Sequence, residues 1–139
     1  MTEQAAPSLL DVNLDDVKEF TTVPDNSEME LTITRGTIDP SKSRIGRHNL
    51  HLILDAGDPT VDDIHQYIPI PTDAWKSEDL KSYQKGVNRF SDMCKCFGIE
   101  MPIQTEQLSG LKGWCIIGEE EDRDSRMRNS IRRYVLSSS

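Results

Sequence analysis

Alternating apolar and polar residues predict five short β-strands in this chain. The first covers residues 27–39. Within it Met29, Leu31 and Ile33 alternate with polar residues, which is the period of a strand with one buried face. Gly36 predicts a bulge or sharp bend late in this strand. The same alternation predicts the other four strands at residues 49–56, 64–71, 111–121 and 130–136.

The alternation also predicts which side chains point away from the core. In the second strand three leucines share one face, so His51 points the other way. In the third strand Tyr67 points outward, and two prolines at its end predict an edge strand. Trp114 in the fourth strand is expected in the core. In the fifth strand the facing of Arg132 and Tyr134 depends on the register.

One amphipathic helix is predicted over residues 79–97, between the third and fourth strands. Its apolar residues recur at spacings of three and four, which gives a single stripe. Ser77 is the expected N-cap, and Gly98 fits the stop position after the last turn. The stripe is expected to be structural, with Phe90 buried against the end of the sheet.

The order of three strands, one helix and two strands predicts the fold class. Five short strands lose their exposed edges when they close into a small barrel, and one helix between strands three and four then plugs its end. We therefore predict a mainly β protein, a five-stranded OB-fold barrel with one amphipathic helix. The expected divisions are an acidic N-terminal arm (1–25), the OB-fold domain (26–136) and a polar tail (137–139).

Charge is distributed unevenly along the chain. The formal net charge is -8. Residues 1–30 hold eight acids and one lysine, whereas residues 31–54 hold four cations and one acid. An acidic protein thus carries a basic island of local charge +3, and local charge is what a bound ligand meets.

The basic island points to nucleic acid. OB-folds bind oligonucleotides across strands two and three and through the loops joining strands 1–2 and 4–5. Lysines and arginines in these loops would hold phosphates, and exposed rings on the strands would stack on bases. The residues expected to contact nucleic acid are Arg35, Lys42, Arg44, Arg47, His51, Tyr67, Arg126, Arg128, Arg132 and Tyr134.

Other chemistry has little support in the sequence. No GxSxG, Walker A or HExxH pattern occurs, so we expect no enzyme and no catalytic residue. The odd set of Cys94, Cys96 and Cys115 lacks the paired spacing of zinc sites, so neither a metal nor a cofactor is expected. Without a long apolar run or a secretory signal, the expected location is cytoplasmic, in the host cytoplasm for a viral protein.

Three stretches carry a resemblance to a known family. They are "YIPIPTDAW", "YQKGVNRFSDMCKCFGI" and "LSGLKGWCIIGEEEDRDSRMRNSIRRYVL". Over roughly residues 25–136 the chain resembles the phage and prophage single-stranded-DNA-binding family once filed as a domain of unknown function. The resemblance implies sequence-nonspecific binding of single-stranded DNA in phage replication or recombination. The acidic segments, residues 1–19 and 119–124, could then repel duplex DNA and cover the groove when no strand is bound, or could recruit replication or recombination proteins.

An alternative function stays open at this point. The same barrel could serve as a protein-interaction or virion-assembly module that binds no nucleic acid. A basic loop is often an ordinary solvated surface, so charge alone does not separate the two.

Overall fold

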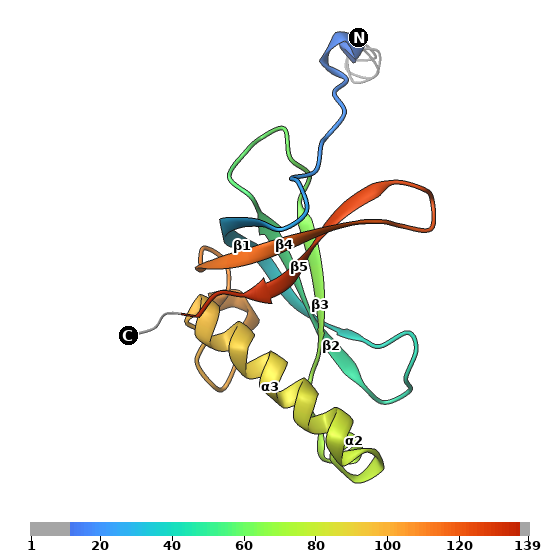
Figure 1. The fold of residues 1–139 in the computed structure, drawn as a ribbon, viewed down its shortest axis with the longest axis vertical. Helices are drawn as coiled ribbons and strands as arrows, with labels where there is room; N and C mark the ends of the chain where they lie inside the picture. Colours follow the sequence, from blue (N-terminus) through green and yellow to red (C-terminus); the bar gives the residue numbers. More distant parts are fainter. Residues whose placement is uncertain (1–11, 137–139) are drawn as a thin grey trace, which may run out of the picture.

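Five antiparallel strands form one sheet in the computed structural model, which describes residues 12–136 (Figure 1). The strand order is β3-β2-β1-β4-β5. Helix α3 runs diagonally below the sheet in Figure 1, with the short α2 beside its first turn. The elements are η1 (Leu14–Asp16), β1 (Ser27–Pro40), β2 (His48–Asp55), β3 (Ile64–Pro69), α2 (Asp73–Glu78), α3 (Leu80–Phe97), η2 (Thr105–Gln107), β4 (Lys112–Glu121) and β5 (Met127–Tyr134).

The predicted mainly β class with one main helix is confirmed, but a closed barrel is not. β3 and β5 are the two edges of the sheet and share no ladder of backbone hydrogen bonds within the described residues. Their link is the buried side chain of Gln66, whose Oε1 accepts a hydrogen bond of 3.0 Å from the Ile131 N–H. The predicted edge position of the third strand is confirmed.

β1 is the central strand and pairs with two partners in succession. Its first half pairs with β4 and its second half with β2. The register with β2 shifts between Ile33 and Arg35, so Thr34 is an extra residue, two positions before the bend predicted at Gly36. Leu108 packs over Gly36 so closely that a Cβ there would lie 2.4 Å from its Cδ1 atom.

The core is aliphatic and lies between the inner face of the sheet and α3. It contains Leu31, Leu52 and Ile117 from the strands, with Met93 and Phe97 from the helix. Phe97 meets Tyr134 edge-on, with ring centroids 6.3 Å apart. The expectation that Phe90 is buried was wrong in degree: Phe90 packs against the core but is only partly buried, because its side chain also lines an open groove beside α3.

The start of the main helix also differs from the prediction. Ser77 lies inside α2, and Asp79 has an extended backbone that separates α2 from α3. The Asp79 side chain accepts from the Ser82 N–H and caps α3, while Thr72 caps α2. Gly98 takes the left-handed conformation (φ 71°) that ends α3, as predicted.

β5 carries a second irregularity that the alternation missed. The register with β4 shifts between Ile116 and Ile117, so Arg132 is an extra residue. Ile131 and Tyr134 therefore both point into the core, although strict alternation would place them on opposite faces. The strand also begins at Met127, earlier than expected.

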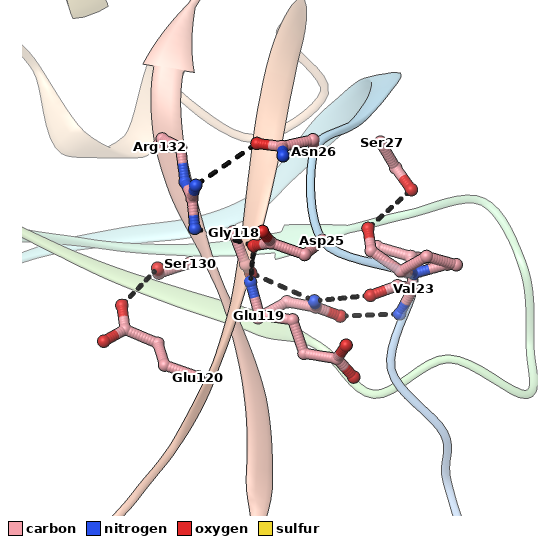
Figure 2. A network of polar contacts seen from close by, with 11 residues as sticks. Val23, Asp25, Asn26, Ser27, Gly118, Glu119, Glu120, Ser130 and Arg132 are labelled. Atoms are coloured by element: carbon pink, nitrogen blue, oxygen red, sulfur yellow. Dashed lines mark hydrogen bonds and ion pairs between the residues drawn. The ribbon is translucent and has the colours of Figure 1, made fainter.

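The chain joins the fold at Thr21, upstream of the expected boundary at residue 26. Thr21 exchanges backbone hydrogen bonds with Thr60 and Asp62. Further along, the Asn129 side chain accepts from the Val23 N–H and donates to the Val23 carbonyl (Figure 2). Asp25 accepts from the Glu119 N–H and from Arg132. The segment 21–26 is thus fastened over the β4–β5 hairpin.

Within residues 12–136 no helix has the length and apolar character needed to cross a bilayer.

The packing of α3 predicts unequal effects for its two C-terminal phenylalanines. Replacing the buried Phe97 by Ala should lower the free energy of unfolding by about 3–5 kcal/mol, since it leaves a cavity against Tyr134. Phe90→Ala should cost clearly less, because its ring is already partly in solvent. Urea unfolding followed by circular dichroism measures both, and equal losses would contradict this account of the core.

Candidate nucleic-acid interface

The outer face of β1, β2 and β3 carries rows of polar and aromatic side chains. Downstream of the extra residue Thr34, Thr37 of β1 lies opposite His51 of β2, which lies opposite Tyr67 of β3. Arg35 is exposed one row away, opposite Ile53. The structure therefore brings three of the predicted residues, Arg35, His51 and Tyr67, onto one face.

Tyr67 presents a ring to solvent with a firm support behind it. Its side chain is 55% exposed, and it stacks on the His51 ring at a centroid distance of 4.2 Å and an interplanar angle of 13°. An aromatic ring held in this way keeps one π-face free, as required for stacking on a base.

His51 is held by neighbours on either side and has little exposed surface. Its Nδ1 lies 3.2 Å from Asp39 Oδ2, and its Nε2 lies 3.0 Å from His65 Nδ1. When Nδ1–H donates to Asp39, Nε2 is left to accept from His65. With its side chain only 14% exposed, His51 supports Tyr67 rather than offering a contact of its own.

The loop between β1 and β2, residues 41–47, projects as a hairpin tip. The Ser41 N–H donates to the Arg47 carbonyl, and Gly46 adopts a positive φ of 80° that closes the turn. Lys42 and Arg44 are exposed at this tip. In Figure 1 this tip and the β4–β5 tip project toward the same side of the molecule, one low and one high.

Arg47 has a different environment from the other two cations. Its guanidinium lies 5.1 Å from the centroid of the Trp75 ring and donates a hydrogen bond to Glu78. Its side chain is only 12% exposed. Arg47 therefore fastens the loop to α2, an element that the sequence patterns did not predict. Trp75 in turn lies against Gly86 of α3, where a Cβ would meet its ring at 2.2 Å.

The two predicted cations at the β4–β5 turn, Arg126 in the loop and Arg128 at the start of β5, have different environments. Arg128 donates to the Asp122 carboxylate, while Arg126 is exposed. The hydrogen bonds from the Arg128 side chain and from the Arg126 N–H hold the pKa of Asp122 below its usual value. Arg128 also lines a cavity of about 60 Å³ together with His65 and Asp62, so the base of this loop lies beside the outer face of β3.

The remaining predicted residues lie elsewhere. Arg132 bonds to Asp25 and Asn26 on the side of the fastened N-terminal segment (Figure 2). Tyr134 is buried in the core, where desolvation raises the pKa of its hydroxyl. That oxygen has no hydrogen-bond partner within the described residues. Tyr134 therefore has no surface to offer a ligand.

Trp114 lies outside the core, contrary to expectation. It is 50% exposed, because Gly113, Cys115 and Ile117 take the inward positions of β4. Gly113 leaves room for Cys96, whose Sγ would lie 2.7 Å from a Cβ at that position. The period-two pattern of these neighbours was the available signal for the outward facing of Trp114.

Cys94 and Cys96 lie in the last turns of α3 and Cys115 lies on β4, where the thiols of Cys96 and Cys115 are in contact. Cys96 Sγ lies 4.0 Å from Cys115 Sγ. The hydrogen bond with Cys115 lowers the pKa of Cys96 and raises that of Cys115, and burial raises the pKa of Cys94. Across residues 12–136, no group of three or more His, Cys, Asp or Glu side chains is arranged to hold a metal ion.

Comparison with known proteins gives no family for this chain: no family model matches it, and no curated protein matches it significantly.

The position of Arg47 predicts a structural role that Arg44 lacks. Arg47→Ala should lower the free energy of unfolding by about 1–2 kcal/mol, because it removes a shielded cation–π contact. Arg44→Ala should leave stability within about 0.5 kcal/mol of the parent, as for other surface substitutions. Thermal unfolding of the two variants tests this, and an Arg47→Ala protein that melts with the parent would contradict the anchoring role.

Proposed function

We propose that this protein binds single-stranded DNA without sequence specificity and acts in phage DNA replication or recombination. The observation that carries the proposal is the exposed Tyr67 ring, stacked on His51 on the outer face of β3. Single-strand binders combine such a ring with a cationic path for the backbone. Lys42 and Arg44 on one hairpin tip and Arg126 on the other supply candidate cations for that path.

The arrangement of strands supports an OB-like domain as the basis for this function. OB-folds are five-stranded barrels that are partly open, and they bind oligonucleotides on strands two and three and through two hairpin loops. In this chain the helix falls between β3 and β4, and Gln66 bridges the two edge strands. We propose that the sheet is an OB-fold barrel left open between β3 and β5.

Local charge supports the same surface. Lys42 and Arg44 make no ion pair with any residue in the described part of the chain, so their charges remain available to phosphates. Arg47 and Arg128 are each paired with a carboxylate, which reduces their pull on a phosphate. We therefore propose that Lys42, Arg44, Arg126 and Arg35 carry the electrostatic part of binding.

The residues that carry the family resemblance and whose positions are known mostly stabilise the fold, and few of them lie on the proposed DNA-binding surface. In the C-terminal stretch that carries the resemblance, Asn129 fastens the N-terminal segment, and Ile131 and Tyr134 fill the core. These positions maintain the sheet. Binding in the proposed protein depends instead on the outer face and loop tips, which tolerate wide variation in sequence.

Removing the exposed ring tests the stacking contribution. Tyr67→Ala should weaken binding of a labelled oligothymidine by about 1–3 kcal/mol, as for other base-stacking aromatics, with little change in salt dependence. Fluorescence anisotropy at several salt concentrations measures this. Trp114→Ala is the matched control, because Trp114 is an equally exposed aromatic on β4. A larger loss for Trp114→Ala would move the proposed site to the other side of β1.

Removing the loop cations tests the phosphate contribution. The double variant Lys42→Ala/Arg44→Ala should weaken binding to all single strands alike. It should flatten the log–log salt slope by roughly 1.4 units, at about 0.7 per phosphate contact.

Lys81→Ala/Lys85→Ala on α3 removes the same charge from another surface and serves as the control. If both double variants flatten the slope equally, binding depends on net charge alone, and the loop has no special role. Absence of single-strand binding by the parent at low salt would favour the interaction-module alternative.

A further inference from the structure

A pair of cysteine thiols connects the end of helix α3 with strand β4. Cys96 lies in the last turn of α3 and Cys115 lies on β4, and their Sγ atoms are 4.0 Å apart. The Cys96 thiol also donates to the Trp114 carbonyl at 3.2 Å, which holds it against the same strand. The proposed DNA-binding face includes neither thiol, so this contact is not explained by the function proposed above.

The backbone of β4 leaves room for the contact. Gly113 lies on the inward face of the strand, two residues before Cys115. A Cβ at Gly113 would lie 2.7 Å from the Cys96 Sγ and 2.9 Å from the Cys96 carbonyl oxygen. A larger residue at this position would therefore push the end of α3 away from the strand. Glycine lets the helix end approach closely enough for the two sulfur atoms to meet.

The third thiol, Cys94, lies on another side of the same helix. Residues two positions apart on an α-helix do not face each other, so Cys94 and Cys96 point in different directions. Cys94 lines the open groove beside α3 instead. The structure thus gives Cys96 a sulfur partner on β4 rather than on its own helix.

The two thiols in contact differ in access and in acidity. Cys96 is partly exposed, whereas Cys115 is completely buried. The hydrogen bond between them lowers the pKa of Cys96 and raises that of Cys115. Because the thiolate is the reactive form, an oxidant reacts first at Cys96. An accessible thiol of lowered pKa beside a second cysteine is the usual arrangement of a redox-sensitive pair.

We propose that Cys96 and Cys115 form a reversible disulfide when the protein is exposed to a peroxide. The Cys96 thiolate attacks one oxygen of hydrogen peroxide, so that an S–O bond forms, the O–O bond breaks and the departing hydroxide takes up a proton to become water. The Cys115 sulfur then attacks the Cys96 sulfur. The S–S bond forms as the S–O bond breaks, and the second hydroxide leaves as water with the Cys115 proton. The two sulfurs together give two electrons to the peroxide, and an external thiol reverses the reaction.

Closing the bond requires a small movement at the end of α3. The sulfur atoms must approach from 4.0 Å to about 2.05 Å. Cys96 lies two residues before the stop at Gly98, and helix ends open more readily than helix interiors. The bond closes a loop over residues 96–115 that contains η2. Peroxide thereby converts a packing contact between helix and sheet into a covalent link.

Peptide mapping of the oxidised full-length chain tests the proposal. Trypsin cuts after Lys95 and Lys112 and so places each cysteine in a different peptide. Treating the folded protein with hydrogen peroxide should lower its intact mass by that of two hydrogen atoms and link residues 96–112 to residues 113–123. Dithiothreitol should restore the original mass. The oxidised protein should melt roughly 5–10 °C above the reduced one, because the disulfide restricts the unfolded chain.

Three variants separate the roles of the thiols. Cys94→Ala is the matched control, because it removes another cysteine of α3 and should leave the rate of disulfide formation unchanged. Cys96→Ser should give no disulfide and a melting temperature that peroxide does not raise. Cys115→Ala keeps a small apolar side chain in the core. It should stop the reaction at the Cys96 sulfenic acid, which dimedone labels.

Three results would overturn the proposal. One is a folded protein that gives no cross-link, whether peroxide leaves Cys96 unreacted or oxidises it beyond the sulfenic acid. Another is a cross-link, or a dimedone label, at Cys94, which would assign the reactive thiol to the groove side of α3. The third is a link between Cys96 and Cys115 that forms in urea but not in the folded protein, which would mean that the native contact does not direct the bond.

Discussion

A single extra residue in β1, Thr34, determines which side chains of that strand face the core and which face solvent. Upstream of it Leu31 and Ile33 point inward; downstream the odd-numbered positions point outward and Gly36 receives Leu108. One added residue exchanges the two faces of everything that follows it in a strand. Without it, Arg35, Thr37 and Asp39 would face the core, where an unpaired charge is costly. The outer face with its polar rows therefore depends on this bulge.

The same constraint explains why two neighbouring arginines in β5 can both reach solvent. Arg132 is the extra residue there, so Ile131 and Tyr134 fill the core while Arg132 and Arg133 remain exposed. Arg132 then bonds to Asp25 and Asn26, which helps fasten the N-terminal segment over the hairpin. In both strands a bulge places apolar residues in the core and charged residues in solvent, although the sequence does not alternate strictly between apolar and polar residues.

Much of the fold could be predicted from the sequence, because alternation and helical periodicity record burial directly. The five strands, the outward facing of Tyr67 and the stop at Gly98 follow from these patterns. The facing of Tyr134 could not be predicted, since it depends on where a bulge shifts the register. Nor could the position of Arg47, which requires α2 to bring Trp75 against the loop. Local sequence patterns do not specify contacts between distant segments. Counting charges along the chain therefore overestimated how many cations are free of ion pairs.

The opening between the edge strands β3 and β5 shows how a contact between distant segments shapes the surface. A ladder there would pair several backbone groups, whereas the described structure has the Gln66 side chain accepting from Ile131. A buried N–H without a partner costs about 1–3 kcal/mol, so this amide satisfies a donor that the open edge would leave unpaired. It does so while spacing the strands by the length of a side chain. The cavity lined by His65 and Arg128 adjoins the same two strands. The open edge thus leaves the base of the β4–β5 loop beside the outer face of β3, where a continuous ladder would have drawn the two backbones together.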